Sequence, residues 1–235
     1  MIEILYFLTF WFFSILYILV KSVKSGEMQF NAKILSKLAP FSTFIKMVPA
    51  GLAAIFVWYN GHESIYLSLV LTTGLFFCML GDIGMERGLI PGLPLFLVAQ
   101  IILIISFTGQ ALDLGISSEA LVLTGVVIMG MLIYLVIFVR YLDSSEKGLG
   151  KFKTPVIIYC IFISGMLSSA VMLWSTSKAM EFVAVVIGGA SFVISDSIIA
   201  IREFHHDISH RELKVISTYH IAIFLLSLSP LLISI

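Results

Sequence analysis

Hydrophobic and polar positions alternate in long blocks along the 235-residue chain, so that each apolar stretch is followed by a short polar one. A helix needs roughly 20 mostly apolar residues to cross the hydrocarbon core of a bilayer. The pattern therefore predicts an all-α, polytopic membrane helix bundle, and we expect residues 1–235 to form a single integral-membrane domain. The eight predicted spanning helices cover residues 2–20, 41–59, 65–82, 92–109, 119–139, 154–174, 182–201 and 214–233.

Composition leads to the same class of protein. The chain is 60% hydrophobic and 12% charged, and a soluble domain of this length could not bury so much apolar surface. The formal net charge is zero, so the overall charge points to no particular partner, and we expect no nucleic-acid partner. The two cysteines, Cys78 and Cys160, both lie in apolar runs. Buried free thiols are the simpler interpretation, and a disulfide between them is the alternative.

Basic residues are concentrated in every second loop. Of the 14 Lys and Arg residues, 12 belong to segments 21–40, 83–91, 140–153 and 202–213 with its flank, whereas the opposite loops hold only Lys178. Cytosolic loops carry such an excess, so both termini are predicted to be extracytoplasmic. The N-terminal segment carries Glu3 without Lys or Arg, unlike a cleavable signal peptide. We expect a multi-pass protein of a bacterial cytoplasmic membrane.

Two carboxylates stand out because an acidic residue in a membrane-spanning segment is costly and usually functional. Asp82 ends the third predicted span, and Asp196 interrupts the seventh, roughly 8 Å below its cytosolic boundary at about 1.5 Å per residue. The opposite half of the spans has few comparable groups. This asymmetry predicts a pocket open to the cytosolic leaflet rather than a channel. Other polar residues at similar depth are Lys46, Gln100, Tyr159, Tyr219 and His220.

Several of these residues also have a purely structural interpretation. Lys46 either extends to the lipid headgroups or pairs with a buried carboxylate. Asp82 is alternatively a helix-end residue at the interface, Tyr219 an interfacial aromatic and His220 a packing residue. The run from His205 to His210 matches no strong metal-site spacing and is expected to be a solvated loop.

The first and fifth predicted helices are expected to be mainly structural, since only Gly125, Gly130 and Tyr134 interrupt the apolar surface of the fifth, and the seventh differs from both. The first is apolar and aromatic throughout, which is typical of a lipid-facing anchor. The seventh carries small residues on neighbouring stripes, at Gly188, Gly189, Ser191 and Ser195, and small residues let a neighbouring helix approach closely. Tight packing is the simplest role for the two glycines.

The polar motifs resemble those of the YhhN/TMEM86 family of membrane proteins. The resemblance rests on Gly-Leu-x-Phe-x-x-x-Gly-Asp at residues 74–82 and on Gly-Ala-x-x-Phe-x-Ile-Ser-Asp-Ser from Gly189 onward. It extends to Thr218-Tyr219 and Lys46-x-x-Pro49, and thus spans the second to eighth helices in order. The Ser-Asp-Ser segment is the most specific part.

The resemblance implies a function. Characterised members of the family are lysoplasmalogenases, which hydrolyse a vinyl ether bond to a fatty aldehyde and a glycerophospho-alcohol. Their presumed catalytic aspartates correspond to Asp82 and Asp196. The sequence departs from the family pattern at Gln100, where many members have His, at Ile223, where many have Gln, and at His220, where an aromatic is more usual. These departures concern substrate identity more than fold.

Vinyl ether hydrolysis requires an acid and an anion near a developing oxocarbenium ion, and two carboxyl groups in different environments can divide these tasks. Burial favours the neutral form of a carboxyl group and a nearby cation favours the charged form. The hypothesis makes the deeper Asp196 the acid and Asp82, paired with Lys46, the ionised partner, although the reverse assignment stays open. Tyr219 and Ser195 are candidates for orienting water or a carboxyl group.

The expected partners are membrane lipids and a lysophospholipid substrate that enters from the bilayer. Arg87, Lys151 and Arg202 are candidates for contacting its phosphate, and topology determination is the alternative role for these residues. The hypothesis requires no metal and no cofactor. A proton-coupled carrier and a non-catalytic lipid-binding protein of the same fold are the alternative functions. The sequence does not define an oligomeric state.

Overall fold

Every regular element is a helix in the computed structural model, which describes residues 2–26, 32–61 and 65–229. The long helices are α1 (Ile2–Lys24), α3 (Ser42–Asn60), α4 (Ile65–Arg87), α5 (Leu89–Asp113), α6 (Ser118–Asp143), α7 (Lys153–Ser177), α8 (Val183–Phe204) and α9 (Arg211–Ser227). Between them lie the short helix α2 (Ala32–Leu38) and three 3-10 turns, η1 (Ala39–Phe41), η2 (Gly150–Phe152) and η3 (Met180–Phe182).

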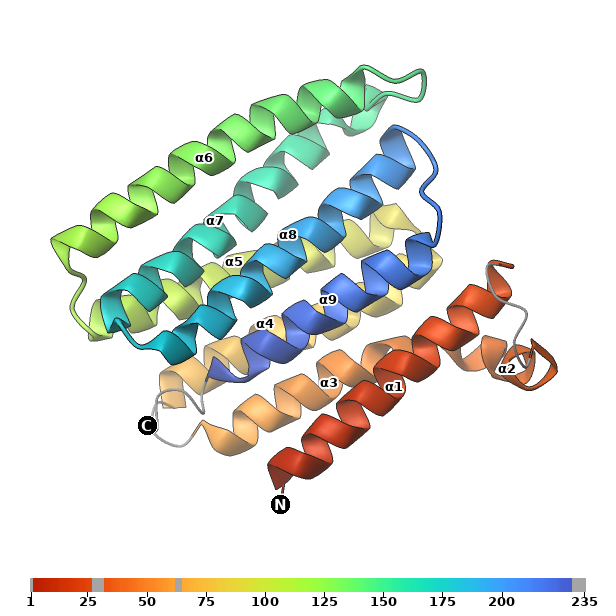
Figure 1. The fold of residues 1–235 in the computed structure, drawn as a ribbon, viewed down its shortest axis with the longest axis horizontal. Helices are drawn as coiled ribbons and strands as arrows, with labels where there is room; N and C mark the ends of the chain where they lie inside the picture. Colours follow the sequence, from red (N-terminus) through yellow and green to blue (C-terminus); the bar gives the residue numbers. More distant parts are fainter. Residues whose placement is uncertain (1, 27–31, 62–64, 230–235) are drawn as a thin grey trace.

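The long helices run side by side, with α1 at one edge of the bundle and α6 at the other (Figure 1). Neighbouring contacts connect α1 to α3, α3 to α4, α4 to α5, α5 to α7, α7 to α8 and α8 to α9, and α9 returns to α1 and α3. Seven helices therefore form a closed ring. Helix α6 lies outside this ring, packed on α7 and only slightly on α8.

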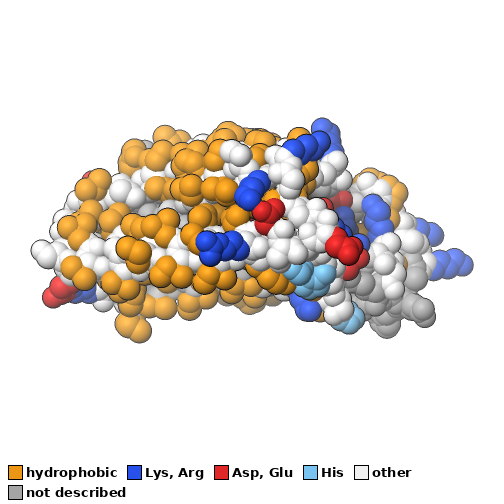
Figure 2. Space-filling model, turned by 90° about the horizontal axis from the view of Figure 1, so that it is seen from above, with side chains coloured by type: hydrophobic (Ala, Val, Ile, Leu, Met, Phe, Trp, Pro, Cys, Tyr) orange, Lys and Arg blue, Asp and Glu red, His pale blue; other side chains and the backbone are white. Residues whose placement is uncertain are grey.

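Seven helical segments in the described part of the chain are long and apolar enough to cross a membrane, so the chain is a multi-pass integral membrane protein. On the face seen in Figure 2, hydrophobic side chains cover most of the surface and charged ones gather mostly towards one end. Helix α9 has 17 residues, and residues 230–233 of the predicted eighth span lie outside the described residues. The count of eight spans and the placement of the termini stay predictions.

Helix boundaries differ from the predicted spans in two places that matter for the site. Helix α4 continues to Arg87, five residues beyond the predicted end at Asp82, and stops at Gly88, whose φ of 137° suits only glycine. The predicted loop 21–40 contains α2, and Leu35 of this helix is buried against Tyr17 and Ile45. Leu35 covers the ends of α1 and α3, and burial of this apolar side chain explains why the segment packs as an additional helix.

The interpretation of α1 as a lipid-facing anchor is correct for only one of its faces. Leu5, Leu8 and Phe12 are exposed, as an anchor requires. The opposite face is buried and includes Tyr17 and Tyr6, whose hydroxyl group forms a 2.6 Å hydrogen bond with Ser227 of α9. The run of aromatic residues concealed this division, because tyrosine and phenylalanine are compatible with both lipid and protein surroundings.

The predicted close packing of α8 is confirmed. A Cβ atom on Gly188 would lie 3.2 Å from the Ala222 carbonyl oxygen of α9, and one on Gly189 would lie 3.2 Å from Leu167 of α7. Ser195 strengthens the contact with α9 by donating a hydrogen bond to the Val215 carbonyl at 3.1 Å. The two glycines thus allow α8 to lie between its neighbours, which places Asp196 inside the bundle.

Candidate functional site

A polar cavity lies towards the end of the bundle where α4 and α8 finish and α9 begins. Helices α1, α3, α4, α5, α8 and α9 all contribute to its lining. Both aspartates singled out in the sequence belong to the lining, together with Lys46, Ser195 and Tyr219. The polar cavity therefore brings together five of the predicted site residues from four different helices.

Asp82 is fully buried within α4, so its interpretation as a helix-end residue at the interface is wrong. The Tyr219 hydroxyl group donates a 2.9 Å hydrogen bond to Oδ2 of Asp82. On the other side, Nζ of Lys46 lies 3.5 Å from Oδ1, which is the predicted pairing of Lys46 with a buried carboxylate. This carboxyl group thus has a hydrogen-bond donor and a cation of its own.

Asp196 has different surroundings. Its side chain is half-buried and accepts a hydrogen bond from the Tyr159 hydroxyl group. Among the described residues, no basic side chain lies within ion-pair distance of it. It precedes the end of α8 by eight residues, or about 12 Å, whereas Asp82 precedes the end of α4 by five, or about 8 Å. Asp196 is deeper along its helix, as predicted, but more exposed to the cavities.

A cluster of three aromatic rings holds the two carboxyl groups in place. Phe96, Phe192 and Tyr219 pack edge-to-face with centroid separations of 5.5 to 6.0 Å. Phe96 reaches this cluster because the facing residue of α4 is Gly81, where an added Cβ would lie 2.8 Å from the Phe96 ring. Phe192 precedes Asp196 by one turn and Tyr219 binds Asp82, so the rings connect the two sites rigidly.

The polar cavity contains a second group of charges, of which the sequence analysis singled out only Arg202, as a candidate phosphate contact. Glu86 accepts hydrogen bonds from the Tyr17 hydroxyl group and from Lys21, whose Nζ is 2.7 Å away. Arg202 and Glu212, also in the lining, are 3.8 Å apart. Glu86 follows Asp82 by four residues and so lies on the same helix face, which is the signal that could have identified it.

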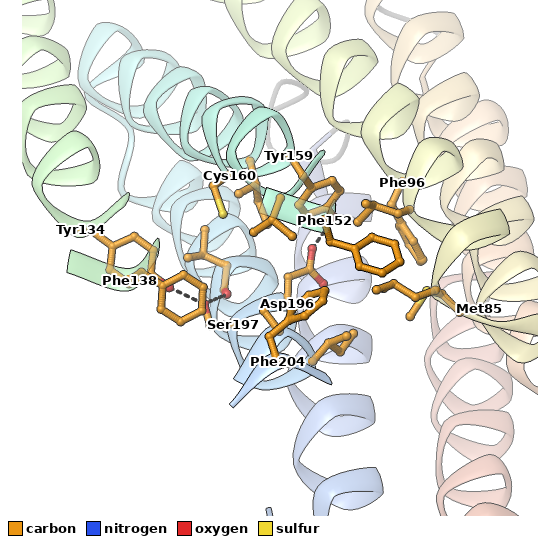
Figure 3. Close-up of a pocket in the computed structure, with 17 residues that line it drawn as sticks. Met85, Phe96, Tyr134, Phe138, Phe152, Tyr159, Cys160, Asp196, Ser197 and Phe204 are labelled. Atoms are coloured by element: carbon orange, nitrogen blue, oxygen red, sulfur yellow. Dashed lines mark hydrogen bonds between the residues drawn. The ribbon is translucent and has the colours of Figure 1, made fainter. Parts of the chain in front are cut away.

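An apolar cavity adjoins the polar one and is lined by residues of α4 to α8 and η2 (Figure 3). Its lining includes Tyr134, Phe138 and Phe152 and also Tyr159, the hydrogen-bond donor to Asp196. The two cavities share four lining residues, Met85, Phe96, Asp196 and Ile199. Asp196 therefore stands at the junction between a polar and an apolar space.

Two of the predicted supporting residues are buried without a partner. Gln100 is fully buried close to Tyr159, and neither of its amide atoms makes a hydrogen bond of good geometry with a described residue. The same holds for both ring nitrogens of His220, which packs against the rings of Phe10 and Tyr219. Buried polar groups normally bind protein or ordered water, so each marks a place suited to a small polar ligand.

Few polar groups are predicted in the half of the bundle away from the two aspartates. This prediction is correct for charged side chains, but uncharged polar side chains are buried there. Ser106 and Gln110 of α5 are buried there, as are Ser168 and Ser169 of α7. The two α7 serines donate to backbone carbonyls of their own helix. Short hydroxyl side chains can therefore be buried at helix contacts without marking a site.

The buried cysteines are free thiols, as predicted, and Cys160 lines the apolar cavity. In a comparison with protein families, residues 41–230 match the model of the YhhN family. No curated protein and no solved structure matched the chain. The matched range begins one residue before α3, covers the chain through α9 and includes both aspartates.

Proposed function

This chain belongs to the YhhN family, and we propose that it is a membrane-embedded lipid hydrolase that cleaves the vinyl ether bond of lysoplasmalogens. The products would be a fatty aldehyde and a glycerophospho-alcohol, as the resemblance to characterised family members implies. The observation that carries the proposal is the position of Asp196, which lines both the polar and the apolar cavity.

A lysoplasmalogen matches this pair of cavities in its chemistry. Its vinyl ether joins a polar glycerophosphate part to a single hydrocarbon chain. With the polar part in the cavity that contains Lys21 and Arg202 and the chain in the apolar cavity, the bond to be cleaved lies beside Asp196. Of the three predicted phosphate contacts, Arg202 belongs to the lining of the polar cavity, which supports its candidacy.

In the proposed first step, Asp196 donates a proton to the β-carbon of the vinyl ether. The electron pair of the double bond forms the new C–H bond, and a lone pair of the ether oxygen stabilises the resulting oxocarbenium ion. Asp196 suits this task because its carboxyl group has no paired cation in the described part of the chain and reaches the apolar cavity. The Tyr159 hydroxyl group orients it and stabilises the carboxylate that remains.

In the second step, water adds to the carbon that bears the positive charge and releases a proton to a carboxylate. The hemiacetal hydroxyl group then loses its proton as the C=O bond forms, the bond to the glycerol oxygen breaks, this oxygen takes up a proton, and the aldehyde leaves. Asp82 is the proposed anion in this step, since Lys46 favours its charged form. Its Oδ1 atom faces Lys46 at 3.5 Å and has no closer hydrogen-bond partner among the described residues, so it can also accept a hydrogen bond from water.

The proposed orientation places the basic end of the bundle, formed by segments 83–91, 140–153 and 202–213 and the described parts of 21–40, at the cytosolic face. The polar cavity lies near that end, because Lys21 and Arg202 in its lining belong to those segments. A lysolipid in the cytosolic leaflet would thus meet the site with its head group at the correct depth.

The experiment that tests the function uses purified protein in detergent. It is incubated with lysoplasmalogen and, separately, with the lysolipid that carries the same chain in an ester bond, and fatty aldehyde is measured. We expect aldehyde from the vinyl ether only, because protonation at carbon requires the enol ether. Release of fatty acid from the ester, or no product from either lipid, would reject the proposal.

A proton-coupled carrier is the second candidate, and one observation favours it. Ser106, Gln110 and Thr176, in the half away from the aspartates, have buried polar atoms without hydrogen-bond partners among the described residues. Water bound to them would extend a polar path from the site. Substrate-dependent proton movement in liposomes without aldehyde production would support this candidate, and lipid binding without either activity would indicate a binding protein.

A further inference from the structure

We propose that Tyr134 and Phe138 of α6 form the wall that decides which hydrocarbon chains the apolar cavity accepts. The identity of the ligand, a single-chain lipid, rests on the proposed function. The role of the wall is a separate question, because it concerns the space beyond Asp196 and not the chemistry at this residue.

The position of the wall follows from the helices that line each cavity. Helices α1, α3 and α9 line only the polar cavity, whereas α6, α7 and η2 line only the apolar one. A lipid whose head group lies beside α1 and α9 therefore directs its chain past Asp196 on α8 and towards α6. Figure 3 shows Tyr134 and Phe138 on the opposite side of Asp196 from Met85 and Phe96.

The two α6 rings form one rigid surface. Their planes are stacked at 15° with centroids 5.2 Å apart. The Tyr134 hydroxyl group forms a 2.6 Å hydrogen bond with Ser197, the residue after Asp196, and so joins α6 to α8 across the cavity. Helix α6 otherwise has little contact with α8, so this bond is one of the few direct links between the wall and the helix that carries Asp196.

The same two side chains separate the cavity from the lipid around the bundle. Helix α6 lies outside the ring of helices, and its neighbouring residues Ile133 and Ile137 are 56% and 62% exposed. Phe138 is only 8% exposed. One layer of aromatic side chains thus limits the space for a chain, and a smaller side chain at either position lengthens the available path.

The first test is the chain-length dependence of hydrolysis by Tyr134→Ala and Phe138→Ala. We expect kcat/KM for longer relative to shorter chains to rise about tenfold, the size that one or two methylene groups contribute in an apolar pocket. Ile137→Ala is the matched control on the lipid-facing side of the same helix and should keep the wild-type profile. If the two alanine variants fail to fold, Phe138→Leu should give a smaller shift of kcat/KM in the same direction.

Tyr134→Phe separates the ring from its hydrogen bond. It keeps the stacked surface and removes only the bond to Ser197, so the chain-length profile should remain that of the wild type. A shift as large as that of Tyr134→Ala would overturn the proposal, because the connection between α6 and α8 would then set the selectivity. Unchanged profiles in Tyr134→Ala and Phe138→Ala would overturn it as well.

A binding measurement distinguishes failure of this inference from failure of the proposed function. Cys160 lines the apolar cavity, whereas Cys78 is fully buried. Both can be followed by N-ethylmaleimide labelling and peptide mass spectrometry. Labelling of Cys160 reports whether a ligand occupies the cavity, and labelling of Cys78 reports unfolding. Saturated alkyl-ether lysolipids of graded length, which lack the vinyl bond, should protect Cys160. The best protecting length should increase in Tyr134→Ala and stay constant in Ile137→Ala.

The outcomes are then separable. In one outcome, protection of Cys160 depends on chain length and shifts in Tyr134→Ala, while no lipid yields aldehyde. This result supports the wall and rejects the hydrolase. Aldehyde production with no shift in either profile supports the hydrolase and rejects the wall. Absence of protection by every alkyl lysolipid in folded protein rejects the wall regardless of activity.

Discussion

Asp82 and Asp196 are the same residue type in the same bundle, yet they have opposite surroundings. Asp82 is closed off from solvent and is compensated by Lys46 at 3.5 Å and by the Tyr219 hydroxyl group at 2.9 Å. Asp196 is half-buried, has a tyrosine but no cation at ion-pair distance among the described residues, and borders two cavities. Two carboxyl groups with such different environments can hold different protonation states, which is how paired carboxyl groups divide acid and base roles.

The difference also concerns what each group can reach. Of the two cavities, Asp82 lines only the polar one, whereas Asp196 lines both. A group that must protonate a carbon between a head group and a hydrocarbon chain has to be at their junction. A group that holds water against a developing cation has to line the polar cavity. The geometry thus favours the assignment of Asp196 as acid over the reverse assignment.

The largest expected effect is the loss of turnover on replacing either carboxyl group. Asp196→Asn and Asp82→Asn should each lower kcat for lysoplasmalogen by about 10²–10⁴-fold, the usual contribution of a general acid or base. Aldehyde release by purified variants measures this loss. Both variants should elute as the wild type does on size exclusion, since asparagine has nearly the same shape as aspartate.

The two variants also separate the proposed roles. Asp196→Asn should still bind alkyl-ether lysolipids, because the cavities keep their shape, and Cys160 protection would show this binding. Wild-type turnover by Asp82→Asn would show that the compensated carboxyl group is structural only. In that case the comparison between the two environments would lose its catalytic meaning, and Asp196 would act alone.

Removal of the cation from the Asp82 site should mainly reduce stability. Lys46→Met leaves a buried carboxyl group without its ion-pair partner, and breaking a buried pair in this way costs about 3–5 kcal/mol. A lower thermal midpoint in detergent measures the effect. The double variant Lys46→Met with Asp82→Asn should recover most of the loss, because no buried charge then lacks a partner.

Lys21→Met is the matched control for this prediction. Lys21 also lines the polar cavity, and its partner Glu86 keeps a hydrogen bond from Tyr17 after the change. The Glu86 side chain is 8% exposed compared with 1% for Asp82, so the loss of stability should be smaller. Equal losses in both variants would contradict the view that Asp82 depends on its cation more than the other acidic residues do.

The sequence was sufficient for the approximate positions of the long helices and for many residues of the candidate site, for a definite physical reason. An apolar run of membrane length is itself the signal for a spanning helix, and an acidic residue within such a run is an energetic exception that can be seen without a structure. Lys46 could be paired with Asp82 in advance because both were placed at one depth. The tyrosines Tyr159 and Tyr219 were found at the same depth, each beside one aspartate.

Other features could not be obtained from the pattern. The buried face of α1, which brings Tyr17 to Glu86, is invisible in an aromatic run that suits lipid equally well. The division of the site into a polar and an apolar cavity depends on how side chains from α4, α5 and α8 meet. Depth along a helix was also a poor guide to exposure, since the deeper Asp196 is the more accessible carboxyl group.

The smallest expected effect concerns Gln100, on the Asp196 side of the site. A fully buried amide without a partner among the described residues is unfavourable, and replacing it with an apolar residue of similar size is neutral or stabilising. Gln100→Leu should therefore keep or raise the thermal midpoint. If the amide holds a water molecule beside Tyr159, aldehyde release should fall at the same time by about tenfold, the equivalent of one hydrogen bond of about 1.4 kcal/mol. A fall in both stability and activity would instead indicate that Gln100 only supports packing. Gln100→Glu retains the acceptor oxygen and distinguishes the two outcomes, because it restores part of the turnover only if the amide holds a water molecule.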